Sequence, residues 1–348
     1  MTGGSNASCA DLRARLDRAR RAHGMIGSAP AYREALEQLA RFAAVDVPIL
    51  IAGETGTGKE LAARTIHYLS GRSDGPFIAI NCGALPERLF ENELFGHRKG
   101  AFTDAGQAQA GLIAQAEGGT LLLDEIDCLD PHSQAALLRF LQDRTYRPLG
   151  SGRMHSADVR FIASTNARLD AIVEDRGFRS DLLFRLDVAR VELPPLRERP
   201  GDIAPLARHF LKAVARRYDR PTPTINPGLE RRLLEHSWPG NIRELENAMH
   251  RAILLADGGR ELPDTMRLTS SHVQAPCAPK RDRGMFFGTL KSERARRTEE
   301  FEREYLTWLL GRSKVNISAA AIEAGTERRH LGRLIHRHGI QVEDFRRK

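Results

Sequence analysis

Short apolar runs alternate with helical patterns between about residues 25 and 195. Each run is mostly apolar at successive positions, which is typical of a strand buried on both faces of a parallel sheet. The strands predicted in this way are Val47–Ala52, Phe77–Ile80, Thr120–Asp124, Val159–Ser164 and Ala189–Leu193. Helical patterns such as Lys59–Leu69 and Ser133–Gln142 lie between them. This order of elements predicts an α/β fold.

Helical patterns alone continue from about residue 200 to 257. Pro239 and Gly240, followed by Asn241, predict a turn into a helix N-terminus. Residues 258–297 are polar and basic with little periodicity, which is typical of a linker. The expected divisions are an N-terminal arm (1–24), an α/β core (25–195), a helical subdomain (196–257), the linker (258–297) and an all-α domain (298–348).

Length and composition fit this organisation. The 348 residues allow two or three domains, and the 41% hydrophobic content is ordinary for a globular protein. Apolar runs fall short of the roughly 18–20 residues of a membrane span, and the N-terminus lacks the apolar segment of a signal peptide. The four cysteines lie far apart, which argues against a disulfide framework or a zinc site. We therefore expect a cytoplasmic protein.

Charge is concentrated at the C-terminal end. The chain carries a net charge of +8, and residues 280–348 alone hold 17 Lys and Arg against 10 Asp and Glu, a net charge of +7. A basic terminal domain indicates a polyanionic partner, most often nucleic acid. A solvated basic tail is the alternative on charge alone.

The stretch GETGTGKE follows a predicted strand and precedes a helical pattern. Glycines let backbone amides curl around a phosphate, the helix N-terminus adds partial positive charge, and Lys59 can reach the β- and γ-phosphates. One departure from the usual motif is Glu60, which stands where Ser or Thr supplies a Mg²⁺ ligand. The predicted nucleotide-binding residues of this loop are Gly53, Glu54, Thr55, Gly56, Thr57, Gly58, Lys59 and Glu60.

Polar residues end two later strands. Asp124 and Glu125 follow the apolar run of GGTLLLDEID, where one carboxylate can hold Mg²⁺ or its waters and the next can polarise an attacking water. Thr165 and Asn166 end FIASTN and are suited to touching a γ-phosphate or that water. Arginines follow these motifs in chain order, at Arg179, Arg185 and Arg243.

A five-residue segment between Gly100 and Gly106 predicts a surface loop with Phe102 at its tip. The order of all these motifs, with GAFTDA between the first two, resembles the AAA+ ATPases of the sigma-54-dependent transcription activators, the bacterial enhancer-binding proteins of the NtrC type. The resemblance runs from about Met25 to Asp257 and is carried by GETGTGKE, NELFGHRKGAFTDA, GGTLLLDEID, FRSDLLFRL, LPPLRER and WPGNIRELEN. It implies a AAA+ P-loop domain with a helical lid, and ATP and Mg²⁺ as ligands.

The resemblance also implies roles for individual residues. Ile26 and Gly27 are expected beside the nucleotide, together with Lys59 and its loop. Asp124 would organise Mg²⁺, partly through water, and Glu125 would be the general base, oriented by Asn81 of NCGAL. The family commonly carries Glu after the loop lysine, which accounts for Glu60.

The arginines imply an assembly. Arg179 and Arg185 look like fingers inserted into a neighbouring subunit's site, and Arg243 like the sensor arginine of the lid. Fingers supplied in trans imply a ring, expected to be a hexamer. Only some 24 residues precede the ATPase domain, so a receiver domain is not expected, and control would come from a regulatory protein in trans, from expression level or from assembly on DNA.

The loop is expected to touch sigma-54 through Phe102, Thr103 and Asp104, because the family's GAFTGA loop does so. Asp104 stands where the family has Gly, and Asp tolerates the left-handed region better than most residues but adds a charge. A Phe folded back into its own domain is the alternative for Phe102.

The C-terminal end resembles the Fis-type helix-turn-helix. NISAAAIEAG predicts a first helix, Gly325 a turn, and TERRHLGRLIHRHG a second helix with Thr326 as its cap. Leu331, Leu334 and Ile335 are expected to pack inward. The residues expected to face DNA are Thr326, Glu327, Arg328, Arg329, His330 and Arg333.

The leading hypothesis is thus an ATP-driven activator that binds double-stranded DNA upstream of a promoter and remodels the closed complex of sigma-54 RNA polymerase. The first alternative is a DNA-binding regulator on the same scaffold that does not use sigma-54, for which Asp104 is the support. The second is a AAA+ remodeller of some other protein, with the basic tail as an anchor.

Overall fold

A computed structural model describes residues 9–22, 24–101, 107–175, 177–255, 261–262 and 317–338, together with residues 298, 302, 305, 306, 309 and 310. The chain divides into two compact units, Met1–Pro279 and Lys280–Lys348. None of the helices in these described ranges combines the length and the apolar character that crossing a membrane requires.

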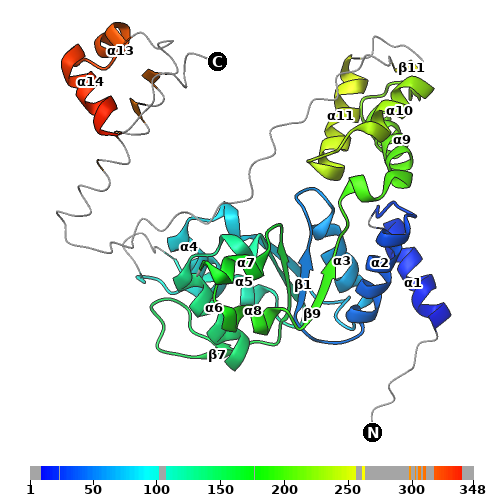
Figure 1. The fold of residues 1–348 in the computed structure, drawn as a ribbon. Coiled ribbons are helices and arrows are strands. Elements are labelled where there is room, and N and C mark those ends of the chain that lie inside the picture. The colour runs from blue at the N-terminus through cyan, green and yellow to red at the C-terminus, as the bar shows by residue number, and fades with distance from the viewer. Residues whose placement is uncertain are drawn as a thin grey trace. The chain divides into compact units, whose positions relative to one another are not determined.

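The first unit is built on a five-stranded parallel sheet (Figure 1). Its strands run in the order β2-β5-β8-β1-β9. All five predicted strands are confirmed, with ends that differ by at most two residues. They are β1 (Ile49–Ala52), β2 (Phe77–Asn81), β5 (Thr120–Asp124), β8 (Arg160–Thr165) and β9 (Ala189–Glu192). Because every strand is parallel, their carboxyl ends meet at one edge, where α/β proteins bind ligands.

Helices cover both faces of the sheet because successive strand residues point to opposite sides. Leu121 and Leu123 pack into one buried cluster with helices on their side, whereas Leu122 packs into the other. The helices that contribute to the first cluster are α4 (Glu87–Phe95), α5 (Leu112–Gln115), α6 (Pro131–Asp143), α7 (Leu169–Glu174) and α8 (Ser180–Leu186). Those of the second are α1 (Cys9–Ala22), α2 (Pro30–Ala43) and α3 (Lys59–Leu69).

The expected N-terminal arm contains the helix α1. Leu16 and Ala19 on α1 are buried in the cluster that α2 and α3 share. Arg15 Nη2 also donates a hydrogen bond to the Leu69 carbonyl at the end of α3, at 3.0 Å. The segment is therefore packed against the core rather than extending from it.

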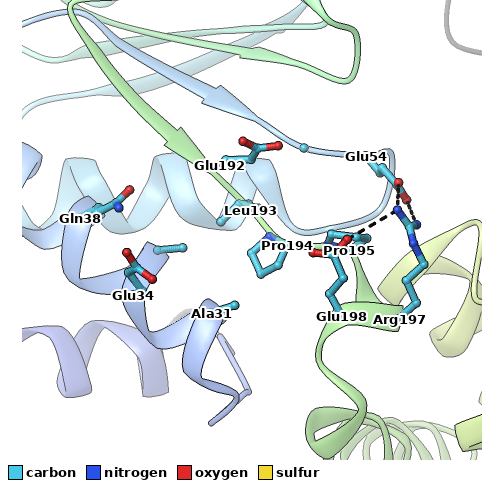
Figure 2. A pocket seen from close by; sticks show the side chains of 12 residues that line it. Ala31, Glu34, Gln38, Glu54, Glu192, Leu193, Pro194, Pro195, Arg197 and Glu198 are labelled. Atoms are coloured by element: carbon cyan, nitrogen blue, oxygen red, sulfur yellow. Dashed lines mark hydrogen bonds and ion pairs between the residues drawn. The ribbon is translucent and has the colours of Figure 1, made fainter.

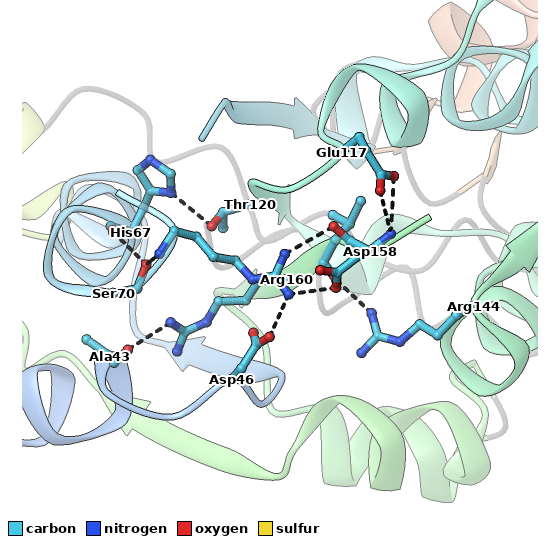
Figure 3. A network of polar contacts seen from close by, with 11 residues as sticks. Ala43, Asp46, His67, Ser70, Glu117, Thr120, Arg144, Asp158 and Arg160 are labelled. Atoms are coloured by element: carbon cyan, nitrogen blue, oxygen red, sulfur yellow. Dashed lines mark hydrogen bonds and ion pairs between the residues drawn. The ribbon is translucent and has the colours of Figure 1, made fainter. Parts of the chain in front are cut away.

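Arginine side chains form ion pairs and hydrogen bonds between segments at the amino edge of the sheet (Figure 3). Arg72 pairs with Asp46 and Asp158, each at 2.6 Å. Arg160, buried at the first position of β8, donates to the carbonyls of Phe42 and Ala43 at the end of α2. These contacts link segments from four parts of the chain at the edge opposite to the ligand-binding one.

Two short hairpins flank the predicted surface loop. β3 (Gly96–His97) pairs with β4 (Gln109–Ala110), and β6 (Thr145–Tyr146) pairs with β7 (His155–Ser156). Leu149 joins them, because its amide donates to the Gly96 carbonyl at 2.8 Å and its carbonyl accepts from the Arg98 amide at 3.0 Å. Phe102, Thr103 and Asp104 lie outside the described residues.

The lid follows β9. It comprises η3 (Leu196–Glu198), α9 (Pro200–Arg217), β10 (Thr224–Ile225), α10 (Pro227–Glu235), α11 (Asn241–Leu255) and β11 (Glu261–Leu262). Its core is centred on buried Trp238, whose Nε1 donates to the Leu233 carbonyl at 2.8 Å. The predicted helices are confirmed, but one expectation is wrong. Glu261 and Leu262, assigned to the linker, form β11 beside β10, and Leu262 is buried in the lid core.

The second unit contains α13 (Ile317–Glu323) and α14 (Arg328–Arg337), with Gly325 at φ +61° between them. Leu331 and Ile335 are buried and Leu334 is half-buried, as predicted. The expected cap is wrong, because α14 begins at Arg328 after Glu327, and no side chain caps it. Thr326 lies one residue too early, and its amide instead donates to the Ala321 carbonyl at 3.0 Å, closing α13.

Candidate nucleotide site

The glycine-rich loop leaves the buried strand β1 and enters α3 at Lys59. Gly56 and Gly58 have φ values of +80° and +101°, a region that favours glycine. Gly53 lies close to Leu193, whose carbonyl would be 3.0 Å from an added Cβ. The loop thus takes the strand–loop–helix path that the sequence predicted, and it presents the N-terminus of α3 at the carboxyl edge of the sheet.

Lys59 is buried at the start of α3. Its Nζ donates to the carbonyls of Gly53 at 2.8 Å and Glu54 at 3.1 Å. Burial lowers the pKa of Lys59, while the charges of Asp124, Asp127 and Glu125 oppose that change. The ammonium therefore lies inside the loop, within electrostatic range of the carboxylates at the end of β5.

The other loop side chains point in different directions. Thr57 is buried and its hydroxyl donates to the Glu54 carbonyl at 2.8 Å. Thr55 Oγ1 accepts from Asn166 Nδ2 at 3.0 Å, so the end of β8 contacts the loop. Glu60, predicted among the nucleotide-binding residues, lies on the exposed face of α3, where its side chain pairs with Arg64 at 2.8 Å. What Glu60 can offer a nucleotide is its position in the first turn of the helix.

The end of β5 brings two carboxylates beside the loop. Asp124 Oδ1 accepts hydrogen bonds from the Ser164 hydroxyl and from the Glu125 amide. Glu125 has a φ of +55°, an uncommon conformation for a residue other than glycine. Its carboxylate faces Gly83, where an added Cβ would lie 2.6 Å from Glu125 Oε2 and 3.3 Å from Asn81 Oδ1. Asn81 and Glu125 thus flank the same glycine.

Two predicted polar residues at this edge of the sheet form hydrogen bonds with other protein groups. Asn81 Oδ1 accepts from the Ala84 amide at 3.0 Å and so caps η1 (Cys82–Ala84). Thr165, predicted to touch phosphate or water, is buried, and its hydroxyl donates to Asp127 Oδ1 at 2.6 Å. Asp127 and Ser164 were not predicted from the sequence, although Asp127 lies in the same DEID stretch as the predicted carboxylates.

The lid contacts the loop directly. Arg197 of η3 forms a two-point ion pair with Glu54, at 2.8 and 2.7 Å (Figure 2). Hydrogen bonding from Arg197 lowers the pKa of Glu54 below its ordinary value. Both residues line a pocket of about 300 Å³ between α2, the end of β9 and the loop. Arg243 lies beside Gly56, where its Cβ would be 3.2 Å from an added Cβ.

A buried polar cluster joins the lid to the segment before α2. Asp202, in the first turn of α9, accepts hydrogen bonds from the amides of Ser28 at 2.6 Å and Ala29 at 3.1 Å. Arg199 is fully buried, with its guanidinium 4.4 Å from the Tyr32 ring centroid. Gly27 is enclosed by Tyr32 and Asp202, and Ile26 packs against the lid core. Ile26 and Gly27 were predicted from the sequence, whereas Arg199 and Asp202 were not.

The predicted finger arginines make contacts within their own subdomain. Arg179 precedes α8 and forms a two-point ion pair with Asp181, at 3.0 and 2.7 Å. Arg185 is exposed on α8, with Nη2 3.4 Å from the Leu141 carbonyl. Phe184, between them, is 82% exposed. Arg179, just before α8, and Arg185 and Phe184 on α8 are therefore all exposed.

Five of the six predicted DNA-facing residues are exposed in the second unit. These are Glu327, Arg328, Arg329, His330 and Arg333, whereas Leu331 and Ile335 of α14 are buried. Thr326 is half-buried before the helix.

Two family models match most of the first unit. Residues 25–192 match the model described as a Sigma-54 interaction domain, and residues 197–278 match that of a AAA+ ATPase lid domain. The chain is 48% identical over 256 residues to the sigma54-dependent transcriptional regulator SfnR of Pseudomonas fluorescens, covering 74% of this chain and 70% of SfnR. It is 39% identical over 323 residues to the nitrogen fixation protein AnfA of Azotobacter vinelandii, covering 93% of this chain and 59% of AnfA.

Solved structures agree with this likeness. The crystal structure of NtrX from Brucella abortus in complex with ATP matches with a TM-score of 0.66 and 32% sequence identity. The match covers 90% of this chain and 69% of NtrX. The parallel sheet with a helical lid is thus shared with a protein that was crystallised with ATP.

Proposed function

Since this chain belongs to the family of sigma-54-dependent transcriptional regulators, we propose that it is an ATP-driven activator that opens promoters bound by sigma-54 RNA polymerase. The observation that carries this proposal is the meeting of Lys59, Asp124 and Glu125 at the carboxyl edge of a AAA+ sheet, beneath the lid. The sigma-54 interaction domain to which residues 25–192 match is itself a AAA+ ATPase.

Hydrolysis requires that the triphosphate be held and a water be activated. Lys59 and the amides at the start of α3 would bind the phosphates. Glu125, whose carboxylate faces Gly83, would take the proton from the attacking water, with the Asn81 amide oxygen beside the same glycine. These roles rest on the positions of the residues and on the family resemblance.

Asp124 is suited to bind Mg²⁺ as a ligand. Mg²⁺ prefers carboxylate oxygens together with substrate phosphates and water. Asp124 Oδ1 accepts from Ser164, and its second oxygen remains for the ion or its waters. When bound, Mg²⁺ would neutralise the charge that develops between the β- and γ-phosphates.

The exposed Arg179 and Arg185 would complete the site of a neighbouring subunit. Their hydrogen bonds go to Asp181 and to the Leu141 carbonyl of the same subdomain. A finger arginine supplied in trans is worth about 10³–10⁵ in rate. Hydrolysis per subunit should therefore rise with protein concentration as the ring, which we expect to be a hexamer, assembles. Arg243, beside Gly56, would report the nucleotide state to the lid.

DNA binding is proposed for α14. Its exposed face carries Arg328, Arg329 and Arg333, and the +7 charge of residues 280–348 would favour a phosphate backbone. Arg329→Ala should weaken binding to an upstream site and lower the salt dependence of that binding. We also propose that a separate regulatory protein controls the activity of this chain.

The experiment that tests the proposal is trapping of sigma-54 by the full chain with ADP and aluminium fluoride, which mimic the transition state of hydrolysis. We expect a complex with the unaltered chain, none with Lys59→Ala, and none with Thr103→Ala. Binding that appears only after Asp104→Gly would show that the ATPase is retained but that the partner has changed. In that case a regulator acting without sigma-54 would be the better account.

A further inference from the structure

Asn241, at the first position of α11, joins three segments of the chain. It is fully buried, with a φ of +52°, a region that Asn tolerates better than most residues. Its Nδ2 donates to the Thr55 carbonyl at 3.0 Å and to Glu54 Oε2 at 3.1 Å. Its Oδ1 accepts from the Leu196 amide at 2.7 Å. Both amide hydrogens and the amide oxygen are therefore used between the lid and the loop.

The next residue extends this contact. The amide of Ile242 donates to the Gly56 carbonyl at 3.0 Å, so two consecutive loop carbonyls are bonded to the lid. Because a trans peptide unit is planar, a carbonyl and the amide of the following residue point in opposite directions. With the carbonyls of Thr55 and Gly56 held on the lid side, the amides of Gly56 and Thr57 are turned to the inner side of the loop. In agreement, the Thr57 amide lies 3.3 Å from the Glu54 carbonyl, which also accepts from Lys59.

Side chains and sterics strengthen the same junction. Arg197 binds both oxygens of Glu54 (Figure 2). Asn241 Nδ2 donates to one of these oxygens as well. Gly56 has no space for a side chain, because an added Cβ would lie 2.3 Å from the Gly240 carbonyl oxygen. The loop and the turn before α11 therefore meet backbone to backbone.

We propose that Asn241 is a positioning residue for the phosphate-binding loop, a role that deepens the ATPase function proposed above. Glycine-rich loops lose much conformational freedom when they are ordered around a ligand. By fixing the loop carbonyls from outside, Asn241 keeps the loop amides arranged for a triphosphate before it binds, and the ordering cost of binding falls. Asn241 touches no reacting atom. It acts through the backbone of Thr55 and Gly56.

The test compares Asn241→Gly with Asn247→Gly in the full chain. Asn241→Gly keeps the positive φ but removes the three side-chain hydrogen bonds, whereas Asn247 is exposed on the same helix. The probe is inorganic tripolyphosphate, competed against a fluorescent ATP analogue, with adenosine as a second competitor. We expect Asn241→Gly to weaken the binding of both ATP and tripolyphosphate by about 10- to 100-fold. The affinity of Asn241→Gly for adenosine should be unchanged, and Asn247→Gly should bind all three ligands as the unaltered chain does.

A second pair of substitutions separates an effect on binding from a loss of folding. Asn241→Asp should weaken tripolyphosphate binding by removing the amide donor and adding a carboxylate beside Glu54. Adding Glu54→Gln should restore part of that affinity, because an amide again faces the carboxylate. The proposal is overturned if Asn241→Gly lowers the unfolding midpoint but leaves tripolyphosphate affinity unchanged, or if it weakens adenosine equally. Sigma-54 is absent from this assay, so its outcome does not depend on the partner.

Discussion

Two glycines of the same loop offer a matched pair of substitutions. Gly56 and Gly58 both have positive φ, so an alanine at either position costs about 1–2 kcal/mol of backbone strain. An added Cβ at Gly58 meets nothing within 4 Å, whereas one at Gly56 lies 2.3 Å from the Gly240 carbonyl oxygen. That backbone atom cannot move aside alone, because the following residues carry the hydrogen bonds from Asn241 and Ile242 to the loop.

Each of those two hydrogen bonds contributes about 0.5–1.5 kcal/mol. We therefore expect Gly58→Ala to lower the free energy of unfolding by about 1–2 kcal/mol, and Gly56→Ala by about 2–5 kcal/mol. The assay is urea unfolding of the full chain without nucleotide, followed by the fluorescence of Trp238, which is buried in the lid. A Trp308→Phe background removes the second tryptophan. Equal losses for the two variants would refute the backbone-to-backbone junction.

Three further predictions follow from the same region. Lys59→Ala should abolish binding of a fluorescent ATP analogue, whereas Glu125→Gln should keep binding and slow hydrolysis by about 10²–10⁴-fold; retained hydrolysis in Glu125→Gln would remove its role as base. Asp202→Ala should lower the free energy of unfolding by about 1–2 kcal/mol, because the amides of Ser28 and Ala29 lose their acceptor. Asp202→Asn should lower the free energy of unfolding less, and thermal unfolding of both variants measures the difference. The pKa of Glu54 is lowered in the folded chain. Ionised Glu54 should therefore contribute fully to stability above the ordinary pKa of 4.5, and this contribution should be lost as the pH falls through the folded pKa. The free energy of unfolding of the Glu54→Gln variant should lack this pH dependence in the acidic range.

Local patterns predicted the elements well. The strand Thr120–Asp124 and the helix Lys59–Leu69 have the same bounds in sequence and structure, and α11 begins at Asn241, where the turn predicted a helix start. A buried parallel strand is apolar at every position, and a helix start is marked by its turn, so both signals lie within a few residues. The β11 pair was missed for the opposite reason. Two residues inside a polar segment have no periodicity, and only their pairing with β10 makes them a strand.

Side-chain partners were harder to predict than elements. Asn241 was expected at a helix N-terminus and is there, but its side chain binds Glu54 and Thr55, more than 180 residues earlier in the chain. The first turn of α11 is held instead by Glu244, whose Oε2 accepts from the Gly240 amide at 2.8 Å. Thr326 shows the same limit at shorter range, because a one-residue shift of the helix start leaves its hydroxyl away from the cap position. Sequence spacing identifies candidates, whereas tertiary contacts decide which partner each one takes.

The contacts of the lid explain why its position and the geometry of the nucleotide site are linked. Asn241, at the start of α11, holds the loop at Thr55, and Asp202, in the first turn of α9, holds the amides of Ser28 and Ala29. Both residues are fully buried, and α9 packs against α11 within one hydrophobic core. The lid cannot turn relative to the sheet without moving or breaking one of these two attachments. A change in the loop around a triphosphate would therefore reach α9 and α11 together, as a displacement of one packed body, and not as independent adjustments of single side chains.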